Sequence, residues 1–202
     1  MATRKAWLVA AVALFTPGAA LAQLSIEGFY GVERPPSTSF HAAVSGAESA
    51  PNLFDSSLQL AGGDVLLNLG GLELGAIADT TFGRHTASQT AIGGLGGVAL
   101  ALAPVQIDLL VEAGGHRYGD FVSDPRIVTA SSTDQWFFYV GLRPGIRIQL
   151  GDGPFFAGVW GFVRWDVNSK GLPVTVGSAR SAGSYDLGGT TIGATLRLGL
   201  QI

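Results

Sequence analysis

The stretch LRPGIRIQL, residues 142–150, decides the fold because its side chains alternate in polarity. The even positions hold leucine, isoleucine or proline, whereas Arg143, Arg147 and Gln149 stand at odd positions. Successive side chains of a strand point to opposite faces, so the stretch is predicted to be a strand with one apolar and one polar face. A soluble barrel would turn the arginines to water, and a membrane barrel would turn them inward.

The same alternation recurs along the chain and predicts eight strands: 24–33, 61–69, 72–82, 89–102, 105–117, 135–150, 154–167 and 186–202. Three connections are tight and carry turn residues typical of hairpins: Gly70-Gly71, Ala103-Pro104 and Gly151-Asp152-Gly153. The other four connections are 34–60, 83–88, 118–134 and 168–185. Tight and longer connections alternate, so we expect the tight turns at one end of a barrel and the longer loops at the other.

The charged residues of each predicted strand share one face, apart from Arg117, and that face is also rich in glycine and alanine. Small residues would leave room for arginine side chains in a narrow lumen. Aromatic residues of the apolar face gather toward the loop end and resemble an interfacial girdle: Tyr30, Phe82, Trp136, Phe138 and Trp165. These features predict an all-β fold, an eight-stranded antiparallel up-and-down transmembrane β-barrel. The alternative is a soluble periplasmic barrel that binds a ligand as lipocalins do.

The N-terminal residues 1–22 have the features of a secretory signal peptide. Arg4 and Lys5 precede the apolar run 6–15, and small residues at 20–22 provide a cleavage site. We therefore expect the barrel domain to span 23–202 and the chain to leave the cytoplasm.

The last predicted strand contains TIGATLRL, residues 191–198, in which a polar residue precedes a glycine and two leucines stand one residue apart. With the signal peptide, eight strands, short turns and long loops, the sequence resembles the small eight-stranded outer-membrane β-barrel proteins of the OmpA and OmpX type. That resemblance implies residence in the bacterial outer membrane, contact with its lipid, and recognition of the C-terminal strand by the barrel assembly machinery. Chains of this type usually end on an aromatic residue, whereas this one ends on Ile202.

Eight strands enclose a lumen just wide enough for side chains, and charges buried there should be paired. Counting residues up from the tight turns predicts three pairs, Asp108–Arg147, Glu112–Arg143 and Glu27–Arg197. We therefore expect a lumen held by an ion network, without an open pore.

The segment 154–167 departs from this pattern. If its charged residues face inward, so do Phe156, Trp160 and Phe162, unless a bulge near Gly161 switches the face. Inward aromatic rings would favour a conduit for small apolar solutes.

Candidate catalytic residues are sparse. The three histidines, His41, His85 and His116, lie in or near predicted loops. His85 with Ser88, or His41 with Asp55 and Ser56, could be read as a hydrolase site at the rim, but neither spacing is a specific motif. No two histidines have metal-ligand spacing, and no cofactor is expected.

The composition restricts the function further. The chain of 202 residues has 15 acidic and 12 basic residues, an excess of acid that argues against nucleic acid as a partner. The leading hypothesis is a non-enzymatic outer-membrane barrel that serves envelope integrity or a surface interaction, with an unknown partner at its loops. The alternatives are the apolar conduit, a lipid-modifying rim hydrolase and the soluble ligand binder.

Overall fold

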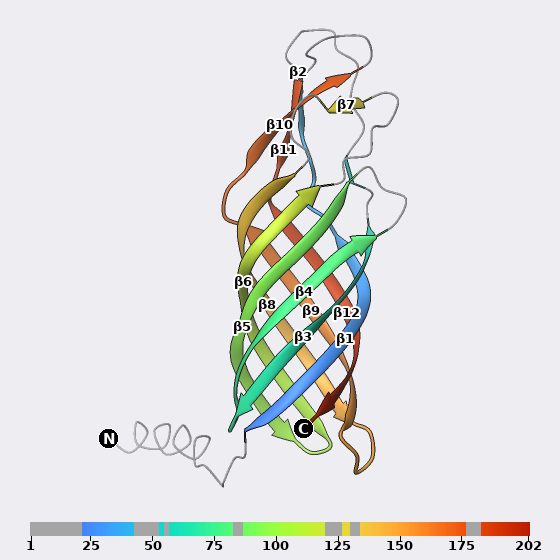
Figure 1. Ribbon diagram of the computed structural model, residues 1–202, viewed down its shortest axis with the longest axis vertical. Coiled ribbons are helices and arrows are strands. Elements are labelled where there is room, and N and C mark those ends of the chain that lie inside the picture. The colour runs from blue at the N-terminus through green and yellow to red at the C-terminus, as the bar shows by residue number, and fades with distance from the viewer. Residues whose placement is uncertain are drawn as a thin grey trace, which may run out of the picture.

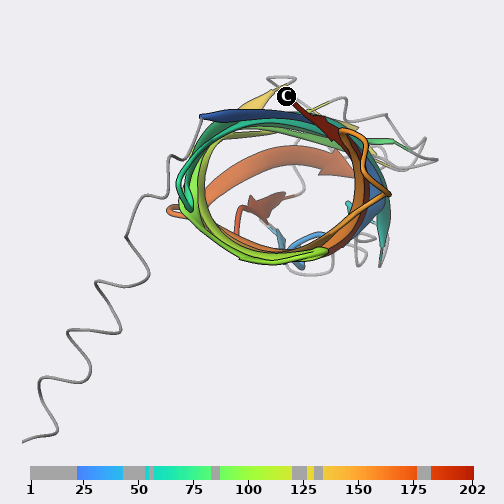
Figure 2. The ribbon, with the colours of Figure 1, turned by 90° about the horizontal axis from the view of Figure 1, so that it is seen from below.

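The computed structural model describes residues 22–42, 53–54, 57–82, 87–119, 127–129, 134–176 and 183–202. Eight long strands close into one antiparallel barrel: β1 (Gln23–Arg34), β3 (Leu58–Leu69), β4 (Leu72–Phe82), β5 (Ser88–Leu102), β6 (Val105–Gly119), β8 (Gln135–Gln149), β9 (Phe155–Asp166) and β12 (Thr190–Gln201). Each strand pairs with its sequence neighbours in the barrel, and β12 pairs with β1 to close it (Figures 1 and 2). The predicted fold class is confirmed. The predicted signal peptide, apart from Ala22, lies outside the described residues.

The register of the strands sets the size of the barrel. Following paired residues once around it from Arg34 returns to β1 at Leu24, ten residues lower. For eight strands this stagger gives a tilt of about 40° and a radius of about 8 Å. The lumen is thus only wide enough for side chains. No helix in the described part of the chain is long and apolar enough to cross a membrane.

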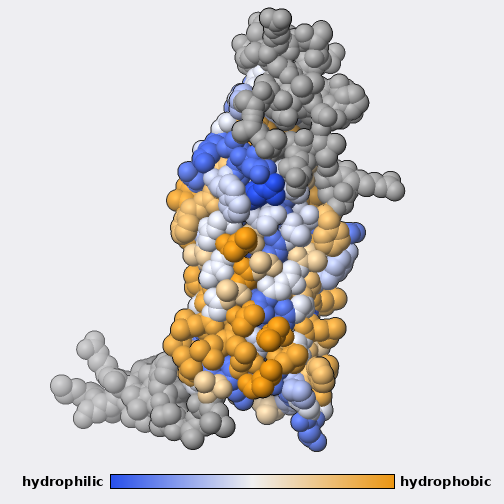
Figure 3. Space-filling model, in the orientation of Figure 1, coloured by the Kyte–Doolittle hydropathy of each residue, from blue (hydrophilic) through white to orange (hydrophobic). Residues whose placement is uncertain are grey.

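Side chains alternate between the two surfaces of the barrel. On β8 the odd positions from Phe137 to Arg147 are buried and the even positions from Trp136 to Ile148 are exposed. The exposed residues of the barrel are mostly large and apolar; Ile146 is 50% exposed and Leu196 67%. Orange, apolar side chains cover the lower part and both edges of the face in Figure 3, with paler residues across its middle. The arrangement is that of a membrane barrel, with charges inside and apolar residues outside.

A second sheet stands above the loop end of the barrel (Figure 1). Its order is β2 (Phe40–Ala42), β11 (Gly183–Leu187), β10 (Lys170–Val176) and β7 (Ile127–Thr129), and we call it the cap sheet. An apolar cluster beneath it contains residues of both the cap sheet and the barrel: Leu53, Phe54, Leu58, Ala87, Tyr118, Phe137, Leu172, Tyr185 and Leu187. The sequence-based view of 34–60, 118–134 and 168–185 as plain connections was wrong, because these segments form a sheet only when they meet each other.

The predicted strand 186–202 was also wrong, since it is divided in two. Gly188 and Gly189 separate β11 from β12 and have φ values of 98° and 139°. Such conformations suit glycine and interrupt a regular ladder. In β9, by contrast, the pairing with β12 continues from Trp165 to Phe155. Its register therefore has no bulge near Gly161.

Candidate functional site

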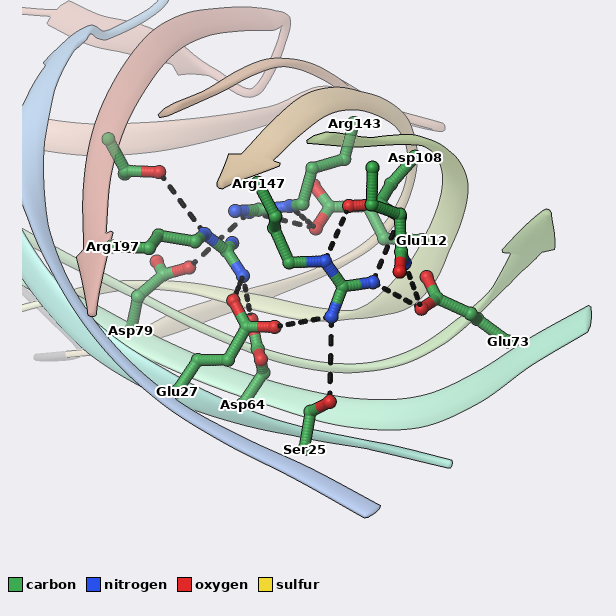
Figure 4. A network of polar contacts seen from close by, with 12 residues as sticks. Ser25, Glu27, Asp64, Glu73, Asp79, Asp108, Glu112, Arg143, Arg147 and Arg197 are labelled. Atoms are coloured by element: carbon green, nitrogen blue, oxygen red, sulfur yellow. Dashed lines mark hydrogen bonds and ion pairs between the residues drawn. The ribbon is translucent and has the colours of Figure 1, made fainter. Parts of the chain in front are cut away.

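The lumen is the candidate site because it collects almost every charge of the barrel strands. Its arginines come from three adjacent strands: Arg143 and Arg147 on β8, Arg164 on β9 and Arg197 on β12. Seven buried carboxyl groups come from the other side of the barrel, on β1, β3, β4 and β6: Glu27, Glu33, Asp64, Glu73, Asp79, Asp108 and Glu112. One arc of the wall is therefore basic and the facing arc acidic, so that the side chains meet near the axis (Figure 4).

Arg147 is the centre of the lower half of this network. Its Nε and Nη2 donate to the two oxygens of Asp108 at 2.8 and 2.9 Å, and its Nη1 donates to Glu27 at 3.3 Å. Nη2 also contacts Glu73, and Nη1 lies 3.5 Å from the Ser25 hydroxyl. Every guanidinium nitrogen thus has a carboxylate partner, which offsets the cost of burying the charge.

Arg197 extends the network toward the strands that close the barrel. Its Nη1 donates to Glu27 Oε2 at 3.1 Å and contacts Asp64. Glu27 therefore bridges Arg197 and Arg147 with its two oxygens. The bridge joins β12, β1 and β8 through side chains as well as through the backbone ladder.

Arg143 and Arg164 form the upper half and share two acids. Arg164 donates to Glu112 at 2.6 Å and to Asp79 at 3.0 Å. Arg143 donates to the other oxygen of Glu112 at 3.1 Å, and its Nη2 lies 3.9 Å from Asp79. Each acid thus lies between two guanidinium groups.

The structure brings together all six residues predicted to line the lumen. The expected partners lie at 2.8 Å for Asp108 and Arg147, 3.0 Å for Glu112 and Arg143, and 3.1 Å for Glu27 and Arg197. The prediction missed four further members of the network, because none of them lies opposite a residue of the other charge on a neighbouring strand. They are Asp64, Glu73, Asp79 and Arg164. Their position on the charged face was the one signal that could have included them.

Aromatic rings alternate with the guanidinium groups along the lumen. The Cζ atom of each of the four lumen arginines lies 4.5–5.8 Å from the centroids of two aromatic rings. The resulting order, which we call the lumen stack, is Tyr139, Arg164, Phe162, Arg143, Phe29, Arg197, Trp160, Arg147 and Phe156. Cation–π contacts of this kind are stronger when water is excluded. The stack fills the lumen with side chains that hold one another.

The small inward residues have a different role from the expected one. A Cβ atom at Gly145 or Gly158 would overlap the ring of Trp160, and one at Gly193 would overlap the ring of Phe162. These glycines therefore make room for the aromatic rings of β9. The expectation that small inward residues leave space for arginines was wrong at Gly145 and Gly193.

His116 lies near the loop end of β6, as expected, and its side chain points into the lumen. It is 1% exposed; its Nδ1 lies 3.0 Å from Asp166 Oδ1 and its Nε2 3.0 Å from Gln89 Oε1. The Tyr118 hydroxyl donates to Asp166 at 2.5 Å, and the Gly189 amide donates to it at 3.2 Å. Because β6 continues to Gly119, the alternation turns His116 inward, and Asp166 joins the barrel wall to the start of β12.

The remaining candidates for catalysis do not form a rim site among the described residues. His41 lies on β2, where its Nε2 is 2.9 Å from Asp186 in an exposed pair. Ser88 begins β5, whereas His85, Asp55 and Ser56 lie outside the described residues. In the part of the chain that the structure describes, no group of three His, Cys, Asp or Glu could hold a metal ion.

The five aromatic residues predicted as a girdle point outward near the loop ends of their strands. Their exposed fractions run from 40% at Trp165 to 56% at Phe138. The rings of Tyr30 and Phe82 lie 5.8 Å apart, and the ring of Trp136 lies over Gly115. Amphipathic rings favour the boundary between hydrocarbon and headgroups.

Comparison with known proteins supports the fold. No family and no curated protein matches the sequence. Among solved structures, Neisserial surface protein A is similar with a TM-score of 0.53 at 8% identity, over 88% of this chain and 96% of that one. The N-terminal barrel of Pseudomonas aeruginosa OprF (TM-score 0.44, 13% identity, 90% and 100% covered) and Ail of Yersinia pestis (0.44, 10%, 87% and 98%) also match. The chain is an eight-stranded barrel of the outer-membrane type, and this architecture places it in the bacterial outer membrane.

Proposed function

We propose that the protein is a non-enzymatic, non-conducting barrel that supports the cap sheet at the cell surface, for envelope integrity or for binding a surface partner. The lumen stack is the observation that carries this proposal. Its rings and guanidinium groups occupy a lumen of about 8 Å radius measured to the backbone. The apolar cluster under the cap sheet includes Leu58, Tyr118 and Phe137 at the loop ends of β3, β6 and β8.

Ion or solute passage would require the stack to come apart. Each of its arginines is bound by at least one carboxylate and is at most 4% exposed. Breaking a buried ion pair costs about 3–5 kcal/mol, and a passing ion would have to break several. The same rings that favoured an apolar conduit are contacts of the guanidinium groups, so they support a filled lumen instead.

Export and assembly complete the proposal. Residues 1–22 would act as the signal peptide, and β12 would present its motif to the barrel assembly machinery. The tight turns would then face the periplasm, and the cap sheet would face the outside.

Two measurements test the proposal. In planar lipid bilayers the wild-type barrel should show no conductance steps, whereas Phe156→Gly with Trp160→Gly should admit ions. Regular steps from the wild type would contradict the filled lumen.

The orientation can be tested with single cysteines, because the chain has none of its own. On intact cells a membrane-impermeant maleimide should label His41→Cys in the cap sheet and should label Asp152→Cys in a tight turn only after lysis. The reverse result would place the cap sheet in the periplasm.

A further inference from the structure

Charge on the outside of the barrel is confined to two positions. Among all outward-facing residues of the eight barrel strands, only Arg34 and Arg117 are charged, and both lie at the loop end. Arg117 is bound to Asp134 at 2.8 Å. Arg34 is exposed and makes no hydrogen bond or ion pair with the residues described. On the outward face of β1, Arg34 follows Val32 and the girdle residue Tyr30 toward the loop end.

An apolar groove of about 700 Å³ runs across the outer faces of β1, β12, β9 and β8. Two rows of ladder partners line it: Tyr30, Leu196, Val159 and Ile146 in one, and Gly28, Leu198, Ala157 and Ile148 in the other. A Cβ atom at Gly28 would meet nothing within 4 Å, so the groove is open to the outside at that point. In a membrane barrel the hydrocarbon of a lipid must fill such a space.

The tilt of the strands places this groove below Arg34. With a strand tilt of about 40°, a line drawn from Arg34 parallel to the barrel axis crosses β12 at Ala194. It then crosses β9 at Val159, about 15 Å below Arg34. On β8 it passes Ile146 and Ile148, the last residues of the two rows, about 22 Å below Arg34. Half of a hydrocarbon core is about 15 Å thick. A lipid whose headgroup lies at Arg34 would therefore have its acyl chain in the groove.

We infer that β1, β12 and β9 form a binding site for a phosphorylated lipid of the outer leaflet, with its phosphate on Arg34 and an acyl chain in the groove. The guanidinium group suits phosphate because it donates two parallel hydrogen bonds. Its position at the surface end of the barrel selects lipid A, the phosphate-bearing lipid of that leaflet. The choice of lipid A rests on the proposed orientation, with the loop end at the cell surface, and does not depend on whether the lumen conducts.

Native mass spectrometry of the detergent-purified barrel titrated with lipid A tests the site. Arg34→Gln should raise the dissociation constant about tenfold, the expected loss for one charge-assisted contact. Arg117→Gln is the matched control, because it removes the other outward arginine at the same end, and it should bind as the wild type does. Gly28→Leu should weaken binding by filling the groove, and Ala157→Leu makes the same test from β9 if the first variant does not fold.

Folding of each variant is checked by its changed gel migration after boiling. Equal dissociation constants for Arg34→Gln and Arg117→Gln would overturn the phosphate site. Unchanged binding after both groove substitutions would overturn the acyl-chain site. Phosphatidylglycerol that binds as tightly as lipid A, with the same dependence on Arg34, would overturn the choice of lipid.

Discussion

Replacing Arg147 by leucine removes the cation on which the lower lumen depends. Among the residues that the structure describes, Arg147 is the only arginine within ion-pair distance of Asp108 and of Glu73, whereas Glu27 also has Arg197. The variant therefore leaves two buried carboxyl groups without a cation. Breaking one buried pair costs about 3–5 kcal/mol, so we expect the free energy of unfolding to fall by at least that amount.

Neutralising the acids in the same variant distinguishes the loss of charge from the loss of packing. Asp108→Asn in the Arg147→Leu background should recover part of the loss, and adding Glu73→Gln should recover more, because both unpaired charges are then gone. Arg117→Leu is the matched surface control. Its pair with Asp134 is partly exposed, at 25% and 39%, and should be worth at most about 1 kcal/mol.

Reversible urea unfolding in detergent, followed by the fluorescence of the three tryptophans of the barrel domain, measures these free energies. A loss for Arg147→Leu no larger than that for Arg117→Leu would refute the buried network. A full loss that neither amide substitution reduces would show that the arginine acts by filling space, and the charge argument would then fail.

Three further variants test other parts of the structure with the same assays. Ile146→Arg places a charge on the lipid-facing surface and should cost about 2–4 kcal/mol if it lies near mid-depth; a cost near zero would contradict its position. Gly145→Ala should destabilise by about 1–3 kcal/mol because its Cβ overlaps the ring of Trp160, whereas Gly28→Ala meets open space and should be close to neutral. Asp166→Ala removes the acceptor that holds the start of β12, so limited proteolysis should cut the cap sheet faster while the barrel remains resistant, and unchanged cutting would contradict that link.

The eight barrel strands, apart from the beginning of the last one, followed from the sequence alone, as did their faces and the three tight turns. The reason is that these features are local: polarity with a period of two reports which face of a strand is buried, and glycine or proline between two such segments reports a turn. The neighbour pairs Asp108–Arg147 and Glu112–Arg143 could be predicted because the height of each residue can be counted from the tight turn at the end of its own strand. The aromatic residues near the loop end were found for the same local reason.

The tertiary structure alone decided the contacts that cross the lumen. Arg147 reaches Glu73 and Glu27 on strands that are not its neighbours, and the lumen stack joins rings and guanidinium groups of four strands. Such contacts depend on closure and on a stagger of ten residues, which no single segment contains. No local sequence pattern predicts the cap sheet either. Its short strands are stable only when loops distant in sequence bury a common apolar cluster. His116 lies inside the predicted strand 105–117, but only the closed barrel shows that its inward side chain meets Asp166 of β9 and Gln89 of β5.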